Sequence, residues 1–218
     1  MRIQDAEARL TRALKRRLPG PDAQQLLAPR PRRGWQPGVT PEDCRHGAGL
    51  LLLYPAGDDT RLLLTKRNIH LPQHAGQVSL PGGSVEPNET TEQGALREAQ
   101  EEVGLDPAAV RVLGQLTPLH IPVSKFVLHP VVGIADERPD LKPDVSEVER
   151  LLEESLSRIG DPRNYSIESR EFRGGFYRVP FIPLDGEKVW GATAMVLAEF
   201  LVILGYKPDP WDPDDRDD

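Results

Sequence analysis

The sequence has a single cysteine and no long apolar run. Cys44 has no second cysteine with which to form an internal disulfide, which is typical of a reducing compartment. No stretch approaches the ~18 apolar residues that a membrane-spanning helix needs, and the first residues lack the charged-then-apolar pattern of a secretory leader. These absences predict a soluble protein of the cytoplasm that has no membrane partner.

Two common kinds of catalytic machinery are also missing. No glycine-rich loop with the lysine of a Walker-type phosphate site occurs in the chain. No Ser-His-Asp or Cys-His set of a nucleophilic enzyme is evident either. Covalent catalysis is therefore the poorer interpretation of this sequence.

Charge is divided unevenly along the chain. Residues 1–48 hold ten Lys/Arg against five Asp/Glu, which leaves 17 against 29 for the rest out of totals of 27 and 34. Apolar residues at helical spacing over 3–18 predict an N-terminal helix, and a proline-rich linker follows. The acidic body would repel a polyanion, so nucleic acid is not an expected partner. The predicted organisation is an N-terminal helix and linker (1–40), an enzyme domain (41–206) and an acidic disordered tail (207–218).

The most informative stretch is GGSVEPNETTEQGALREAQEEVGL, residues 82–105. Thr90 and Gln93 have the spacing of a capping box, which predicts a helix that starts just after Thr90. Gly104 is typical of the left-handed residue that ends a helix, and Pro107 prevents continuation. We therefore expect a helix that runs to about Val103.

On that helix the glutamates occupy a stripe beside the apolar one. Glu98 and Glu102 lie one turn apart and Glu101 adjoins them, so their like charges destabilise the bare helix slightly. A divalent cation would reverse this effect, and oxygen ligands of this kind suit Mg²⁺ or Mn²⁺. Taken alone, three glutamates more often form a solvated acidic face.

Arg97 and two glycines shift the balance towards a site. Arg97 can reach Glu89 or Glu101 and hold a carboxylate in place, as the outer groups of metal sites do. Gly82 and Gly83 precede the helix, and glycine allows the backbone to approach a metal or a phosphate closely. In isolation, a Pro-Gly-Gly run would indicate only a tight turn.

These residues together resemble the box of the Nudix hydrolase family, which runs glycine, five residues, glutamate, seven residues, Arg-Glu, an apolar residue, any residue, Glu-Glu, any residue, glycine and an apolar residue. The positions that match are Gly83, Glu89, Arg97, Glu98, Ala99, Glu101, Glu102, Gly104 and Leu105. The resemblance implies an α/β fold, an α/β/α sandwich with a mixed β-sheet. It also implies metal-dependent hydrolysis of a nucleoside diphosphate derivative, a small-molecule nucleotide substrate.

The resemblance assigns roles to the matching residues. Glu98 and Glu102 would be the main metal ligands, with Glu101 and the Gly82 carbonyl as further ligands. Arg97 and Glu89 would brace the loop and the helix. The general base differs among relatives. It would be a glutamate of the box such as Glu98, or an acidic residue of a later loop such as Glu147. For Glu147, however, a solvated helix residue is the more common role.

The segment before the box, LLLTKRNIHLPQHAGQVSLPGG (62–83), resembles the coenzyme A pyrophosphatase subfamily. The positions that fit its signature are Leu63, Leu64, Thr65, Arg67, Gly76, Pro81, Gly82 and Gly83. The resemblance implies that Arg67, Gly82 and Gly83 contact the substrate. Three positions depart: Asn68, Leu80 and Pro72, where the signature has an arginine. Pro72 lacks both that bidentate donor and a backbone N–H.

Two other functions stay open. Pro122 lies about where ADP-ribose-type relatives carry a proline, so an ADP-ribose or dinucleotide pyrophosphatase is the first alternative. The second is a non-catalytic Nudix-like module that only binds nucleotides, although clustered anions would serve a pure phosphate binder poorly. A homodimer is a further open expectation.

Outside the motifs, hydrophobic patterns predict the remaining elements. GAGLLLLYP and RLLLTKR are expected to form a hairpin, and VRVLGQL, FVLHPVVGIA and GGFYRVPFIP to form strands. SEVERLLEESL and WGATAMVLAEFLVILG are expected to be helices.

Overall fold

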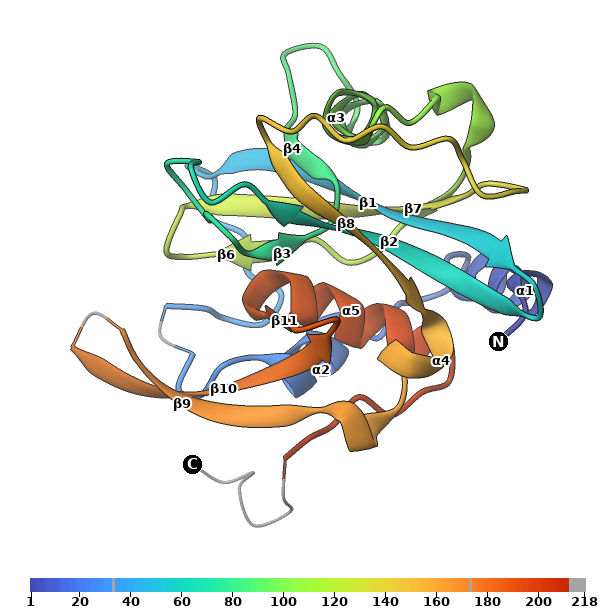
Figure 1. The fold of residues 1–218 in the computed structure, drawn as a ribbon. Coiled ribbons are helices and arrows are strands. Elements are labelled where there is room, and N and C mark those ends of the chain that lie inside the picture. The colour runs from blue at the N-terminus through green and yellow to red at the C-terminus, as the bar shows by residue number, and fades with distance from the viewer. Residues whose placement is uncertain (33, 173, 212–218) are drawn as a thin grey trace.

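A mixed β-sheet runs through the middle of the molecule (Figure 1). The structure is a computed structural model that describes residues 1–32, 34–172 and 174–211. The strands of this sheet are β1 (Arg45–Ala56), β2 (Asp59–Arg67), β3 (Val78–Ser79), β4 (Gly82–Ser84), β5 (Arg111–Gln115), β6 (Leu119–Ile121), β7 (Phe126–Ile134) and β8 (Val148–Ser155).

The strand order along the main path is β3-β2-β1-β7-β5. β4 pairs with β1, β6 with β7, and β8 with β2. β1 and β7 are parallel and the other pairs are antiparallel, so the sheet is mixed. The expected α/β fold with a mixed sheet is confirmed.

Helices cover both faces of the sheet, because the strands bury apolar side chains on both sides. The α-helices are α1 (Ile3–Ala13), α2 (Pro21–Gln24), α3 (Thr91–Val103), α4 (Leu156–Ile159) and α5 (Gly191–Ile203). In Figure 1, α3 lies above the sheet and α5 with α2 lies below it. Along β1, Leu50 and Leu52 pack on the α3 side while Leu51 and Leu53 pack on the α5 side.

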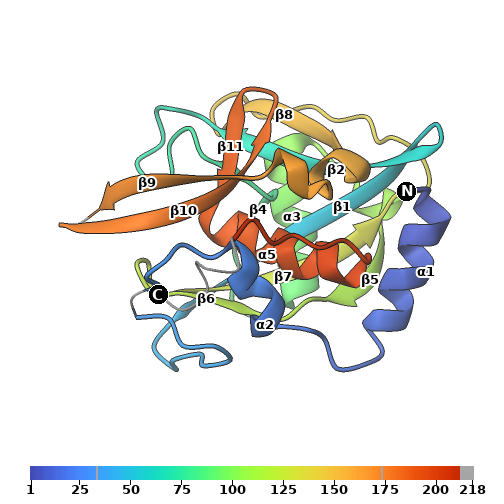
Figure 2. The same cartoon turned by 90° about the horizontal axis from the view of Figure 1, so that it is seen from below.

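A second, three-stranded sheet lies beneath α5. Its strands are β9 (Ser166–Phe172), β10 (Gly175–Leu184) and β11 (Glu187–Trp190), in the order β11-β10-β9. Figure 2 shows β9 and β10 as a two-stranded arm that extends past the end of α5. β11 lies beside β3, and the Thr193 hydroxyl at the start of α5 donates to the Val78 carbonyl at 3.2 Å. The start of α5 is therefore fixed close to the segment that leads into β4.

Most of the expected elements are present, with one clear error. The β1–β2 hairpin, β5, β7, β10 and α5 fall where the patterns place them. The segment SEVERLLEESL was expected to be a helix, but most of it is strand β8, which pairs with β2 over Leu64↔Leu152 and its neighbours. The prediction was wrong because pairing with a buried partner strand outweighs local helix propensity.

The N-terminal region packs onto the same core as α5. The N-terminal helix is shorter than expected, ending at Ala13. Its Leu10 belongs to the core cluster that contains Leu197 and Phe200 of α5. Glu199, fully buried, accepts hydrogen bonds from the Gly20 amide, the Gln24 amide and the Thr117 hydroxyl. The proposed division at 40/41 stays a prediction, but these contacts tie the first segment to the body.

The predicted disordered tail needs one correction. Trp211 is 4% exposed, and its indole N–H donates to the Leu26 carbonyl at 2.9 Å. The Arg30 guanidinium stacks on the same ring at 4.0 Å. The chain is thus packed as far as Trp211, because an aromatic side chain supplies the apolar contact that the aspartates cannot. The rest of the predicted tail, 212–218, lies outside the described residues.

Candidate active site

The glutamate helix is defined by its own sequence at both ends. The Thr90 hydroxyl accepts from the Gln93 amide at 3.2 Å, and the Gln93 side chain accepts from the Thr90 amide at 2.9 Å. This reciprocal pair is the predicted capping box. At the other end Gly104 has a left-handed backbone with φ 66°. Helix α3 therefore has the boundaries that the sequence predicts.

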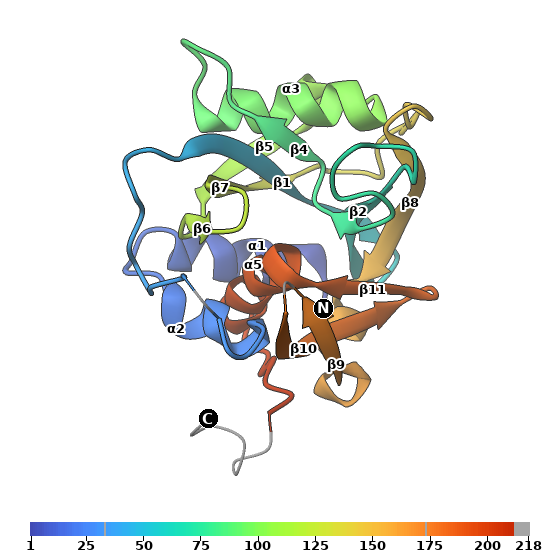
Figure 3. The ribbon, with the colours of Figure 1, turned by 90° about the vertical axis from the view of Figure 1, so that its left-hand side faces the viewer.

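One face of α3 packs on the sheet and thereby fixes the direction of the glutamates. Ala95, Ala99 and Val103 are fully buried against residues of β1 and β7. Glu98 and Glu102 occupy the neighbouring stripe, where the Glu98 carboxylate lies against Gly83 and the Glu102 carboxylate accepts from the Gly82 amide. Figure 3 shows α3 running above β4. The small alanines allow α3 to lie close to the strands, so the carboxylates reach the backbone of β4.

Gly82 and Gly83 are required by close packing on both sides of β4. They pair with Gly49 and Ala48 of β1. A Cβ atom on Gly82 would overlap the Ala48 carbonyl, and one on Gly83 would overlap the Glu98 carboxylate. Any larger residue at these positions would push β4 away from β1 or displace Glu98.

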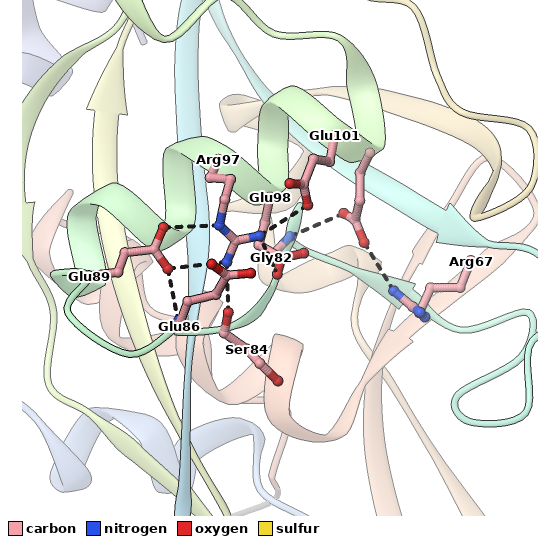
Figure 4. Close-up of polar contacts among 9 residues, drawn as sticks. Arg67, Gly82, Ser84, Glu86, Glu89, Arg97, Glu98 and Glu101 are labelled. Atoms are coloured by element: carbon pink, nitrogen blue, oxygen red, sulfur yellow. Dashed lines mark hydrogen bonds and ion pairs between the residues drawn. The ribbon is translucent and has the colours of Figure 1, made fainter.

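Arg97 is the centre of the charged cluster (Figure 4). Its guanidinium donates to Glu89 at 2.9 and 3.1 Å, to Glu98 at 3.1 Å and to Glu101 at 3.0 Å. It also donates to the Ser84 carbonyl at 2.9 Å. The sequence analysis named Glu89 and Glu101 as alternative partners of Arg97, and the structure has both. The contact with Glu98 and the contact with the Ser84 carbonyl were missed, and a backbone carbonyl has no sequence signal. Through Arg97, the loop before α3 is fastened to the helix and to β4.

Glu102 is the most deeply buried member of the cluster, with a side chain 2% exposed. It accepts from the Gly82 amide at 3.1 Å and from Arg67 at 3.1 Å. Burial nonetheless raises the pKa of the Glu102 carboxyl to about 7, because the loss of solvation outweighs these two favourable contacts. A buried carboxylate of this kind is a group that a cation would stabilise.

Glu98 and Glu147 complete the acidic surroundings. Burial also raises the pKa of the Glu98 carboxyl, and Arg97 only partly offsets this. The negative charge of Glu147 contributes to the raised pKa of both Glu98 and Glu102. The loop that carries Glu147 is held near the site by Asn68, whose backbone N–H donates to the Glu147 carbonyl at 2.7 Å. Three acidic side chains from two segments therefore influence one another here.

The donor set fits a hard divalent cation in chemistry, but the carboxylates are at present held by arginines. The side chains near Gly82 that could bind a metal offer carboxylate oxygens, the ligands that Mg²⁺ and Mn²⁺ favour. Within the described part of the chain, no three His, Cys, Asp or Glu side chains are already grouped around a single metal position. Glu101 is 59% exposed and pairs with Arg97 at 3.0 Å.

No helix within 1–32, 34–172 or 174–211 has the length and apolar character to cross a membrane.

Comparison with known proteins adds independent information. A family model described as the NUDIX domain matches residues 45–168, more than half of the chain. A relative from Salmonella paratyphi B, named "Uncharacterized Nudix hydrolase NudL", is 40% identical over 148 residues, covering 67% of this chain and 77% of the relative. The relative from Salmonella newport has the same values.

A solved structure supports the fold. The MutT/nudix family protein from Enterococcus faecalis superposes with a TM-score of 0.53 at 19% identity, covering 80% of this chain and 69% of that one. Nudix hydrolases cleave the pyrophosphate bond of nucleoside diphosphate derivatives and generally use a divalent metal, commonly Mg²⁺ or Mn²⁺. The family match and the NudL relatives show that this chain belongs to the Nudix hydrolase family.

Proposed function

We propose that this Nudix hydrolase cleaves coenzyme A or an acyl-CoA, giving 3′,5′-ADP and (acyl)phosphopantetheine. The observation that carries the proposal is the position of Arg67. This arginine lies at the end of β2, in the segment that resembles CoA pyrophosphatases, and it reaches the buried Glu102 carboxylate at 3.1 Å. The subfamily-like segment therefore adjoins the glutamates that would hold the metal.

In the proposed site, Glu98 and Glu102 are the main metal ligands. Glu101 and the Gly82 carbonyl are the additional ligands. When bound, Mg²⁺ or Mn²⁺ supplies neutralisation of phosphate charge and acidifies a water molecule. Glu102 is buried beside the negative charges of Glu98 and Glu147, so a bound cation would stabilise its carboxylate.

The other residues position the site. Arg97 links Glu89, on the loop, with Glu98 and Glu101, on the helix. These ion pairs would hold the proposed metal ligands at a fixed spacing when substrate binds. Arg67 and the backbone of Gly82 and Gly83 are the proposed substrate contacts. A guanidinium beside the scissile diphosphate would bind its oxygens.

A general base must take the proton from the attacking water. Glu98 and Glu147 are both candidates, since each is a carboxylate close to the buried Glu102. Glu147→Gln separates them, because Glu147 is not among the proposed ligands: if Glu147 is the base, this variant loses the acidic limb of the pH–rate profile and still binds metal, and if the profile is unchanged, Glu98 is the base.

The alternative function is hydrolysis of ADP-ribose or of a dinucleotide. Pro122 supports it and lies in the turn between β6 and β7, where its carbonyl accepts from the Lys125 amide. Pro72 weakens the CoA proposal, because an exposed proline stands where CoA-type relatives have an arginine. The second alternative is a module that binds nucleotides without hydrolysing them.

Product analysis distinguishes these functions. The protein is incubated with CoA, ADP-ribose and a dinucleotide in turn, each with Mg²⁺ and with Mn²⁺, and the products are separated by chromatography. Release of 3′,5′-ADP from CoA supports the proposal, and AMP from ADP-ribose alone supports the alternative. No product from any of the three, with nucleotide binding retained, supports the binding module.

The cytoplasmic location and a homodimer are also proposals. The single Cys44, unpaired in the structure, supports a reducing compartment. Fractionation of cells that produce the protein tests the location, and light scattering of the purified protein tests whether two copies associate.

A further inference from the structure

A groove of about 1090 Å³ lies between α1, the segment that joins α1 to α2, and the end of α5. Four arginines line it: Arg9, Arg12, Arg16 and Arg17. Arg9 donates to the Leu204 carbonyl at the end of α5. The other three are exposed and form no ion pair within the described part of the chain. Asp22 is the one acidic residue among the described residues of the lining, so the groove concentrates positive charge on a protein of net charge −7.

The rest of the groove is largely apolar and stiff. Its lining includes Pro19, Pro21, Pro37, Pro118, Val202 and Ile203. Because the proline ring fixes φ, a wall rich in proline loses little conformational freedom when a ligand binds. An apolar wall beside a group of guanidiniums suits a ligand that has a flat ring at one end and phosphates at the other.

A buried glutamate holds two walls of the groove together. Glu199 on α5 is fully buried, and it accepts from the Gly20 amide at 3.1 Å and from the Thr117 hydroxyl at 2.7 Å. The Gln24 side chain donates to Glu199 at 3.0 Å and to the Thr117 carbonyl at 2.9 Å. Gly20 and Thr117 both line the groove. These contacts fix the spacing of its two walls, so the groove is formed before any ligand binds.

The groove is separate from the candidate active site. Figure 3 shows α1 and α2 across the main sheet from α3, which carries the glutamates. All four arginines precede residue 45, where the segment matched by the family model begins. A ligand in this groove would therefore be a different molecule from the substrate at the metal site.

We propose that the groove is a second binding site, which takes a nucleoside polyphosphate with its phosphates among Arg12, Arg16 and Arg17 and its base against the prolines. Guanidiniums bind phosphate oxygens through paired N–H donors. A bound anion would also relieve the repulsion among the arginines. The volume of the groove is comparable to that of the largest small-molecule sites, which reach about 1,000 Å³.

The charge of the rest of the chain limits the length of the ligand. Residues 49–218 hold 17 Lys/Arg against 29 Asp/Glu, so a long nucleic acid would leave the groove and meet an acidic surface. A short polyanion of nucleotide size avoids that repulsion. The inference does not depend on which substrate the active site cleaves.

Binding is measured by isothermal titration calorimetry of the whole protein in the absence of divalent metal. ATP is the probe, inorganic triphosphate supplies the phosphates without a base, and adenosine supplies the base without phosphates. We expect ATP to bind at least about 10-fold more tightly than either, because both parts of the groove contribute. Equal affinities for ATP and triphosphate overturn the assignment to a nucleotide.

Two double variants of equal net charge separate a specific site from a general electrostatic effect. Arg12→Gln/Arg16→Gln removes two charges from the groove, and Arg2→Gln/Arg163→Gln removes two exposed charges elsewhere. We expect the affinity for ATP to fall roughly 10- to 100-fold in the first and to stay within about twofold in the second. Equal losses in the two variants overturn the proposal.

A third variant distinguishes the groove from the active site. Arg67→Gln alters the candidate active site alone, so it should leave intact the binding that Arg12→Gln/Arg16→Gln loses. Loss of ATP binding in Arg67→Gln, with retention in the groove variant, would place the nucleotide at the active site and overturn the proposal. Absence of ATP binding to the unaltered chain also overturns it. Attachment to vesicles of phosphatidylcholine and phosphatidylglycerol would then assign the arginines to a membrane surface.

Discussion

Replacing Glu102 by glutamine tests the metal-ligand proposal most directly. The amide of glutamine has nearly the shape of the carboxylate, and its oxygen can still accept from the Gly82 amide. It cannot carry the charge that pairs with Arg67 or that binds a cation. If Glu102 is a ligand, we expect kcat to fall at least ~10³-fold, equivalent to about 4 kcal/mol in the activation barrier.

The fold should survive this substitution. Desolvation of Glu102 outweighs its attractive contacts, so removing its charge relieves a cost while it breaks the pair with Arg67. We expect the free energy of unfolding in the absence of metal to change by no more than ~1 kcal/mol, a shift of about 2–4 °C in Tm for a chain of this size. A large loss of stability would mean that the effect on kcat is not specific.

The response to metal provides a readout apart from activity. A cation that binds only the folded state stabilises it by about 2.7 kcal/mol at 100 times its Kd. The unaltered chain should therefore gain Tm on addition of Mg²⁺ or Mn²⁺, and Glu102→Gln should gain much less. Glu92→Gln is the matched control, because Glu92 is on the first turn of the same helix. Near-normal Mg²⁺-dependent activity in Glu102→Gln would refute the ligand assignment.

Three further substitutions follow from the contacts. Gly83→Ala places a Cβ against the Glu98 carboxylate, so kcat should fall by roughly 10²-fold with unchanged circular dichroism, and an unchanged kcat would show that Glu98 can move at no cost. Pro72→Arg should lower KM for CoA if this position faces the substrate phosphates, and an unchanged KM would mean that it does not. Glu199→Ala leaves the Gly20 and Thr117 donors unpaired, so the free energy of unfolding measured by chemical denaturation should fall by about 3 kcal/mol. Glu171→Ala, at an exposed position, is the control and should lower it by under about 0.5 kcal/mol. Equal losses would contradict a structural role for Glu199.

The ends of α3 could be predicted from the sequence because their determinants are local. Thr90, Gln93 and Gly104 set the helix ends through contacts within a few residues, and helical spacing alone places Glu98 beside Glu102. The same reasoning failed for β8, where the apolar residues suit a helix as well as a strand. Only the presence of β2 as a partner decides between the two, and that partner is more than 80 residues away in sequence.

Burial of charge was the other property that the sequence could not supply. Glu102 is one charged residue among many in the sequence, and nothing in its neighbours shows that its side chain is 2% exposed. Its burial results from how α3 packs beside β4 and the end of β2, which depends on the whole fold. For Glu102 the motif replaced this missing information.

The ion pair between Arg67 and Glu102 bears on how substrate and metal would bind. In the proposed site, Arg67 already neutralises Glu102, so a cation must compete with it for this carboxylate. Substrate phosphates would draw Arg67 away and free the Glu102 carboxylate for the metal, while Arg97 keeps its contacts with the loop and the helix. Substrate and metal should therefore bind cooperatively, each lowering the Kd of the other. Titration of metal at several concentrations of a non-hydrolysable diphosphate measures this coupling, and a metal Kd that is independent of the ligand would contradict the exchange of partners.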